Sequence, residues 1–301
     1  MRCYAQLFVR TIAAVSRTTP LAAQKIMTSA DLSSLSAPPP DARIAYGPGP
    51  LQYGNLRLPK TPGPHQVVVY IHGGCWLSEY NITHAAAAEQ GIADAGYAVW
   101  SLEYRRVGDE GGGWPGTFAD VARGADFLRE IAPKYALDLR HVVAAGHSAG
   151  GEFALWLASR RKIPQTSELY APDPLPVRGV LGLAPAPDLE GLHANGVCDH
   201  VIDKLMGGSP TDHPERYAVT SLMQLAPLPV PSVLVIGAHD QGWGPVGRSY
   251  LARALAAGDT AVHVVDAPEA GHFEIINPAS SSWPLVTSAL KELFARIGAA
   301  R

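Results

Sequence analysis

The fold of this chain is decided by one stretch, His141-Val-Val-Ala-Ala-Gly-His-Ser-Ala-Gly-Gly-Glu-Phe-Ala-Leu-Trp-Leu-Ala-Ser-Arg160. Its first half is a short apolar run rich in β-branched residues, which is typical of a buried strand. Its second half spaces Phe153 and Trp156 as on one face of a helix. Between them lies Gly146-His-Ser-Ala-Gly150, and a G-x-S-x-G sequence between a strand and a helix indicates a sharp turn with Ser148 at its apex. Glycines flank the serine because such a turn is too tight for β-carbons there.

Length and composition are those of a globular protein with a large core. The chain has 301 residues, of which 47% are apolar and 17% charged, so extensive disorder is not expected. The net charge of −3 gives no reason to expect nucleic acid or an anionic membrane as a partner. No apolar run approaches the roughly 20 residues that span a bilayer. The cysteines, Cys3, Cys75 and Cys198, are far apart and odd in number, so we expect neither a disulfide framework nor a zinc site.

The N-terminal region differs in composition from the rest of the chain. Residues 1–30 carry basic side chains and no acid, which fits a targeting segment, although Arg10 and Arg17 interrupt the apolar run that a secretory signal needs. Residues 33–40, rich in Ser and Pro, indicate a linker. We therefore expect a disordered or targeting segment over 1–41, one folded domain over 42–301 and a cytoplasmic location.

Short apolar runs alternate with helical patterns along the expected domain. Strands are expected over 42–59 (two, joined by a turn), 65–71, 97–104, 141–146, 178–183, 231–237 and 261–265. Helices are expected over 83–95, 117–132, 149–160, 245–257 and 284–298, the second of them beginning at a capping box of Thr117 and Asp120. Residues 185–229 look like a small insertion over the active-site side of the sheet. The alternation predicts an α/β fold with a mostly parallel central sheet covered by helices on both faces.

Three side chains that suit nucleophilic catalysis follow expected strand ends, where open α/β sheets collect their active groups. They are Ser148, Asp240 and His272, in that order along the chain. A serine hydroxyl is a poor nucleophile until a base removes its proton, and an imidazole, with an ordinary pKa of roughly 6.5, suits that task. Asp240 would hold the imidazole of His272 in the right tautomer and stabilise its cation. The pattern predicts catalysis through an acyl-enzyme.

The oxyanion that develops during such an attack needs preorganised N–H donors. The amide of Ala149, directly after the nucleophile, is one expected donor. The turn of Gly73, Gly74 and Cys75 is expected to supply the others, because absent or small side chains let its backbone approach the substrate. His72 is expected to brace this turn by hydrogen bonding rather than to act as a base.

Each assignment of an acid or a base has a rival in the sequence. Asp188 follows the preceding strand and competes with Asp240, which by itself would also fit a helix N-cap. His239 and His263 compete with His272. Of these, His263 lies within a strand pattern and His239 adjoins the expected acid, so we favour His272.

Three tryptophans lie in loops near the strand ends. Trp76, Trp114 and Trp243 each fit core or lid packing, and together they would line an apolar acyl or aryl pocket. Cys75 fits a small residue of that pocket better than a reactive thiol. Glu152, one helical turn after the serine, has no assigned role.

The pairing of His72-Gly-Gly-Cys-Trp76 with Gly146-His-Ser-Ala-Gly-Gly151 resembles the α/β-hydrolase superfamily. Within it, the chain is similar to the esterase and lipase branch that carries H-G-G-x-W, which includes kynurenine formamidases and bacterial feruloyl-esterase-like proteins. The tract Leu205-Met-Gly-Gly-Ser-Pro210 is similar to the insertion of that branch. The chain departs from the hormone-sensitive-lipase pattern, where a third glycine would stand at Cys75. The resemblance implies an α/β-hydrolase fold and the serine, acid, histidine and oxyanion turn named above.

We therefore expect a serine hydrolase of small carboxylic esters that uses neither a cofactor nor a metal. Its expected partner is a small-molecule ester or amide, and a homodimer is left open. Two alternatives remain. One is an arylformamidase that cleaves N-formyl-kynurenine with the same groups, since formamidases share H-G-G-x-W. The other is a non-catalytic ligand-binding protein on the hydrolase fold, although such proteins usually lack part of the triad.

Overall fold

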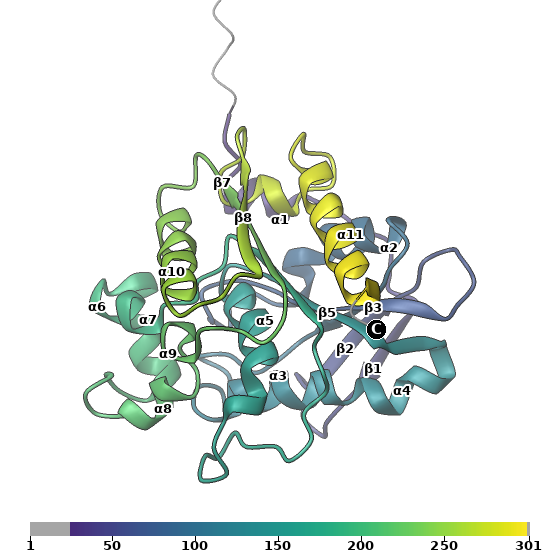
Figure 1. Ribbon diagram of the computed structural model, residues 1–301. Helices are drawn as coiled ribbons and strands as arrows, with labels where there is room; N and C mark the ends of the chain where they lie inside the picture. Colours follow the sequence, from purple (N-terminus) through teal and green to yellow (C-terminus); the bar gives the residue numbers. More distant parts are fainter. Residues whose placement is uncertain (1–24, 300–301) are drawn as a thin grey trace, which may run out of the picture.

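The short apolar runs of the sequence become strands of one sheet. The computed structural model describes residues 25–299, and the strands in that range are β1 (Ala42–Ala45), β2 (Tyr53–Arg57), β3 (His65–Ile71), β4 (Ala98–Leu102), β5 (Leu137–His147), β6 (Gly179–Leu183), β7 (Ser232–Gly237) and β8 (Val262–Ala267). Within the described residues they form an eight-stranded sheet in the order β1-β2-β4-β3-β5-β6-β7-β8 (Figure 1). β2 pairs antiparallel with β1 and β4, and the other neighbours are parallel. The predicted α/β fold with a mostly parallel sheet is confirmed.

Helices connect the parallel strands. They are α1 (Ser29–Ser33), α2 (Ala86–Asp94), α3 (Gly116–Asp126), α4 (Leu128–Tyr135), α5 (Ala149–Ser159), α6 (Leu189–Ala194), α7 (Val197–Met206), α8 (Pro214–Ala218), α9 (Leu222–Leu225), α10 (Gly244–Ala256) and α11 (Trp283–Ala299). Short 3₁₀ turns cover Ile82–Ala85, Arg160–Lys162 and Glu274–Ile276. Helices α6 to α9 lie in the segment predicted as an insertion, between β6 and β7 (Figure 1).

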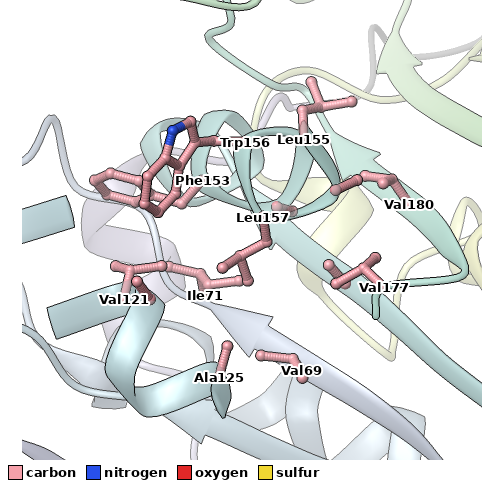
Figure 2. Close-up of a cluster of buried hydrophobic side chains, with 14 of the residues drawn as sticks. Val69, Ile71, Val121, Ala125, Phe153, Leu155, Trp156, Leu157, Val177 and Val180 are labelled. Atoms are coloured by element: carbon pink, nitrogen blue, oxygen red, sulfur yellow. The ribbon is translucent and has the colours of Figure 1, made fainter. Parts of the chain in front are cut away.

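The sheet separates two apolar layers because successive side chains of a strand point to opposite faces. From β3, Val69 and Ile71 belong to the layer that includes α3, α4, α5 and α10, whereas Val68 and Tyr70 belong to the layer of α2 and α11. Figure 2 shows Trp156 and other side chains of α5 near Val69, Ile71 and side chains of α3. Helix α5 is buried along its whole length, which fixes the residue before it, Ser148, against the sheet.

The start of α3 differs from the prediction. The helix begins at Gly116 without a side-chain cap, so the expected capping box of Thr117 and Asp120 is wrong. The Asp120 carboxylate instead accepts hydrogen bonds of 2.7 and 2.8 Å from the guanidinium of Arg105, and the Thr117 hydroxyl donates to the Arg105 carbonyl. The Asp120 carboxylate, which the pattern assigned to capping the helix, is bound instead by the Arg105 guanidinium of the preceding loop.

Of the segment predicted as a tail over 1–41, residues 25–41 are described, and they contain α1 and contact the domain. Leu32 of α1 is only 4% exposed, and the Arg57 guanidinium of β2 donates to the Pro38 carbonyl over 2.8 Å. Residues 1–24, on which the disorder and targeting expectations also fall, lie outside the described residues. Within 25–299, no helix combines the length and the apolar character that crossing a membrane requires.

Candidate active site

The turn around Ser148 is sharp, as the sequence pattern indicates, and its backbone is strained at the serine. β5 ends at His147 and α5 begins at Ala149, leaving Ser148 between them with φ 55° and ψ −119°. A β-carbon at Gly146 would lie 2.1 Å from the Gly150 carbonyl oxygen. One at Gly150 would lie equally close to the carbonyl oxygen of Ile71 in the neighbouring strand. Only glycine fits on either side, so the serine is held at the carboxyl end of β5.

An imidazole and a carboxylate meet at the carboxyl ends of two other parallel strands, β7 and β8. Asp240 follows β7, His272 follows β8, and Nδ1 of His272 lies 2.7 Å from Oδ2 of Asp240. Burial alone would raise the pKa of the Asp240 carboxyl. Its hydrogen bond with His272, the positive charge of that ring when protonated and bonds from the amides of Trp243 and Gly244 outweigh burial and lower the pKa. Asp240 therefore stays ionised and can orient the ring.

The rival residues have other partners or other surroundings. Asp188 caps α6, where its carboxylate accepts from the Gly191 amide over 2.9 Å. His263 lies within β8 and faces Glu292 on α11 at 3.5 Å, and His239 is exposed. The described structure thus pairs His272 with Asp240 rather than with any rival.

Ser148 and His272 line the same small cavity, whose volume is about 80 Å³. Its full lining is Ser29, Gly74, Cys75, Tyr80, His84, His147, Ser148, Trp243, His272 and Phe273. Side chains and backbone from several separate loops therefore converge there. Among residues 25–299, no group of three or more His, Cys, Asp or Glu side chains is arranged to hold a metal ion.

The glycine turn after β3 forms another wall of the cavity. A β-carbon at Gly73 would lie 3.2 Å from the Ser148 Cβ, which places the turn directly against the serine. Gly74 has φ +116°, and a β-carbon there would lie 2.3 Å from the Tyr80 Cβ. Ala149 begins α5, so its amide is one of the first-turn N–H groups that lack an intrahelical acceptor. The residues expected to donate to an oxyanion therefore lie around the serine.

His72 braces the glycine turn, as its expected structural role requires. It is fully buried, with Nδ1 2.8 Å from the Gly73 carbonyl oxygen and Nε2 3.2 Å from Oε1 of Glu103. The other Glu103 oxygen accepts from the Ile82 amide over 2.9 Å, at the start of the 3₁₀ turn before α2. Glu103, which directly follows β4, is a supporting residue that the sequence reasoning missed.

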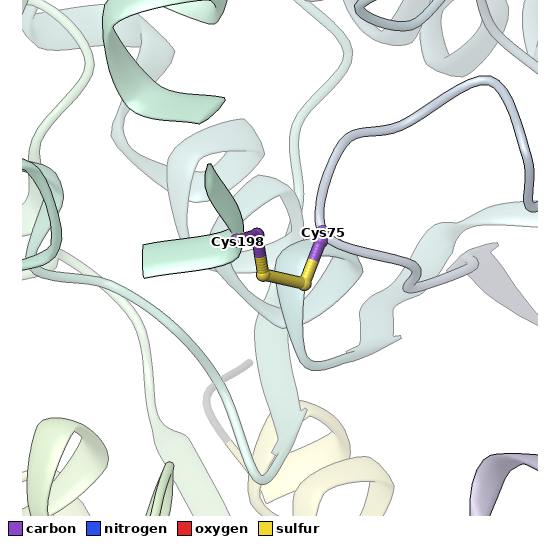
Figure 3. The surroundings of a disulfide bond; sticks show 2 residues. All are labelled: Cys75 and Cys198. Carbon is purple, nitrogen blue, oxygen red and sulfur yellow. A yellow bond between two sulfur atoms is a disulfide. The ribbon is translucent and has the colours of Figure 1, made fainter. Parts of the chain in front are cut away.

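The expectation that the cysteines form no disulfide is wrong. Cys75 of the glycine turn is bonded to Cys198 near the start of α7 (Figure 3). The partners are 123 residues apart, and a pairing over that distance cannot be read from spacing alone. Cys3 lies outside the described residues. Cys75 does line the cavity, but as half of a covalent link between the glycine turn and the insertion.

Of the tryptophans expected in the pocket, only Trp243 lines this cavity. Trp76 is fully buried in the core. Trp114 lies away from the cavity lining, where its indole N–H donates to Glu168 over 3.1 Å and its ring packs against Phe118. Apolar residues in loops near strand ends fit core packing as well as a pocket, which is why the pattern could not separate them.

Two further histidines line the cavity without having been predicted. Nε2 of His147 lies 2.9 Å from the His272 carbonyl oxygen, which only accepts, so Nε2 carries the proton. Burial is the main reason that the pKa of His147 is well below its ordinary value, and it lowers that of His84 to about 3. Both rings are therefore neutral and lie near His272. His147 directly precedes Ser148 in the G-x-S-x-G sequence, which places it beside the serine, whereas nothing in the local sequence of His84 signals its position.

Comparisons with known proteins agree with this fold. The model of the BD-FAE family matches residues 55–249. The esterase LipC of Mycobacterium tuberculosis is 26% identical over 248 residues, which cover 79% of this chain and 60% of LipC. Esterase B from Lactobacillus rhamnosis superposes with a TM-score of 0.74 at 21% identity, covering 86% of this chain and 87% of that one. Esterase LipW from Mycobacterium marinum gives 0.66 at 20% identity, covering 85% and 81%.

Proposed function

Since the chain belongs to the BD-FAE family, a group of α/β-hydrolase esterases, we propose that it hydrolyses small carboxylic esters through Ser148, His272 and Asp240. One observation carries the proposal. Ser148 and His272 line the same cavity, and the ring of His272 is oriented by a carboxylate 2.7 Å from its Nδ1. The LipC likeness supports it, although the chain spans only 60% of LipC's length.

Acylation begins when Ser148 Oγ attacks the ester carbonyl carbon while Nε2 of His272 takes the hydroxyl proton. The carbonyl oxygen becomes an oxyanion facing the amides of the glycine turn and of Ala149. Asp240 stabilises the imidazolium that forms. When the tetrahedral intermediate collapses, the carbon–oxygen bond to the alcohol breaks and His272 returns its proton to the leaving alkoxide. The product is an acyl ester of Ser148.

Deacylation repeats the same steps with water as the nucleophile. His272 takes a proton from the water as its oxygen attacks the acyl carbon, and the same amides hold the second oxyanion. Collapse releases the carboxylic acid, and the proton returns to Ser148 Oγ. No step needs a group other than these residues and water.

The cavity volume supports a small acyl or alcohol group. About 80 Å³ is far below the roughly 300–1,000 Å³ of typical small-molecule pockets. Such a space suits a formyl or acetyl group better than a long chain or an aryl ring, so we propose short-chain esters as substrates.

The decisive experiment replaces the nucleophile. We expect Ser148→Ala to lower kcat on p-nitrophenyl acetate by more than about 10⁴-fold, because the attacking group is lost. The variant should unfold at the same urea concentration as the wild type. In parallel, a fluorophosphonate probe should label the wild type on Ser148 and leave the variant unlabelled. Turnover at the wild-type rate in the variant would rule out this mechanism, and an unlabelled wild type would favour the ligand-binding alternative.

The formamidase alternative is tested in the same assay. A formyl group also fits the cavity, so N-formyl-kynurenine should be measured beside p-nitrophenyl acetate. We expect the ester to be the better substrate. A kcat/KM about a hundredfold higher on the formamide would reverse that order and leave the roles of Ser148 and His272 unchanged.

A further inference from the structure

One wall of the cavity comes from a segment far from the rest of the lining in sequence. We define the strap as residues 26–35, which include α1. Ser29, its first helical residue, lines the cavity together with Ser148 and His272. No other part of the described chain before β3 contributes to that lining.

The strap is attached to the loop that carries His272. The Met27 amide donates to one carboxylate oxygen of Glu274, and the other oxygen accepts from the Gly271 amide over 2.8 Å. Glu274 is only 4% exposed, so this carboxylate joins the two segments away from bulk water. The Asn277 side chain adds a contact of 3.3 Å to the sulfur of Met27. The position of the strap is therefore tied to the position of the catalytic loop.

Apolar contacts and a helix cap hold the strap in shape. A β-carbon at Gly271 would lie 2.5 Å from Cγ2 of Ile26, so only glycine lets the strap approach the loop this closely. Leu32 is 4% exposed and belongs to the core layer of α2 and α11. Thr28 and Asp31 form a complete capping box at the start of α1. The strap is thus a built element that presents Ser29 to the cavity.

We propose that the strap is the size-limiting wall of the substrate cavity, so that its docking restricts the enzyme to short esters. The inference rests on the proposed ester hydrolysis. Most other walls are fixed by the sheet edge, by the disulfide or by burial of the nucleophile turn. The strap is held by one buried carboxylate, one close glycine contact and one buried leucine, so a single substitution can undock it or enlarge it.

The first test enlarges the wall in the full-length chain. Ser29 and Ala30 are both exposed, but only Ser29 lines the cavity, so Ser29→Phe should fill part of the cavity whereas Ala30→Phe places the same ring outside the lining. We expect Ser29→Phe to lower kcat/KM on p-nitrophenyl butanoate relative to acetate by about tenfold or more, because single methylenes in a fitted pocket have effects of that order. Ala30→Phe should keep the wild-type ratio.

The second test detaches the strap from the core layer of α2 and α11. Leu32→Asp puts a charge into the core contact of α1, and Ser33→Asp puts the same charge on an exposed position of the same helix. Amide hydrogen exchange over residues 27–35 should rise in Leu32→Asp alone. We expect this variant to raise kcat/KM on p-nitrophenyl octanoate relative to p-nitrophenyl acetate by about tenfold, or to do the same for octyl acetate relative to methyl acetate. Ser33→Asp should match the wild type.

The two proposals fail in different ways. If the wild type hydrolyses none of these esters, the proposed function is wrong. Suppose that the wild type hydrolyses p-nitrophenyl acetate, but Ser29→Phe changes neither the preference among acyl groups (acetate, butanoate, octanoate esters) nor the preference among alcohols (methyl and octyl acetate). The strap then has no effect on substrate size, and the inference is overturned. The inference is also overturned if Leu32→Asp raises amide hydrogen exchange over residues 27–35 without changing the preference among acyl groups or among alcohols. Should Leu32→Asp fail to fold, Ser29→Phe decides alone.

Discussion

At the residue scale, the carboxyl of Glu152 is in an unusual environment. It lies fully buried on α5, and neither of its oxygens has a hydrogen-bond partner among the described residues. Burial raises its pKa well above the ordinary value of a glutamate. The indole N–H of Trp76 offsets this in part, yet it does not reach hydrogen-bond geometry with the carboxyl. An ionised group there would be costly, so Glu152 holds its proton in the folded protein.

This proton makes stability depend on pH in a definite direction. Above an ordinary pKa of about 4.3, the unfolded chain loses the proton and the folded chain keeps it, so raising the pH favours unfolding. The stabilisation is complete below that value and declines as the pH rises toward the folded-state pKa. The slope is at most about 1.4 kcal/mol per pH unit.

We expect Glu152→Gln to remove this slope, because the amide keeps the shape and does not titrate. Urea unfolding at pH 5, 6, 7 and 8 measures it, and the variant should gain stability over the wild type as the pH rises. Glu130→Gln, at an exposed position of α4, is the control and should follow the wild type. Parallel curves for the wild type and Glu152→Gln would mean that the carboxyl is already ionised.

Site residues that belong to a recognisable sequence pattern could be predicted. Site residues that reach the cavity only through the tertiary structure could not. Ser148 lies in a turn whose glycines follow from sterics, and the predicted sharp turn is present. Asp240 and His272 follow strand ends and lie 2.7 Å apart, as expected of an acid and a base that cooperate. Glu103 also follows a strand end, and applying that rule to every strand would have found it. His84 and Ser29 carry no such signal, since only the folded chain brings them to the cavity.

At the element scale, the glycine turn after β3 is held from two sides. His72 and Glu103 brace it from the core, and the disulfide to Cys198 joins it to α7 of the insertion. Cys75 and Trp76 both have positive φ, 49° and 56°, which costs free energy for residues other than glycine. Residue patterns predicted the turn and the insertion as separate elements, but a cross-link between them depends on tertiary structure.

Cutting this link should impair catalysis. We expect Cys198→Ala to lower kcat/KM on p-nitrophenyl acetate by about 10- to 100-fold, mainly through kcat. The reason is that the turn donates to an oxyanion present only in the transition state. A thiol reductant should produce the same loss in the wild type and no further loss in Cys198→Ala. Full activity in the reduced wild type would show that His72 and Glu103 hold the turn without help.

At the scale of the whole molecule, the same disulfide closes a long loop. Its partners are 123 residues apart and enclose α2 to α6 with three strands of the sheet. A disulfide is stable in oxidising compartments and is rare in the cytosol. The cytoplasmic location expected from the sequence stays a prediction.

We expect the loss of this closure to destabilise the protein by about 2–4 kcal/mol, since the unfolded chain regains the freedom of a long loop. Urea unfolding of the wild type and of Cys198→Ala, each with and without reductant, measures the effect. The reduced wild type and the variant should share one midpoint below that of the oxidised protein. Equal midpoints in all four samples would contradict the expectation.

The position of the strap in the sequence limits how far the substrate preference of one relative can be inferred from that of another. Residues 55–249 are the part that matches the family, and they contain the nucleophile turn. The strap precedes that part and His272 follows it, so two walls of the cavity fall outside the aligned region. Two relatives with nearly identical matched segments can therefore differ in the esters they admit. Grouping such enzymes by the esters they cleave requires an alignment of the segments on either side of residues 55–249. The strap and the loop that carries His272 contact each other, so they should be compared together.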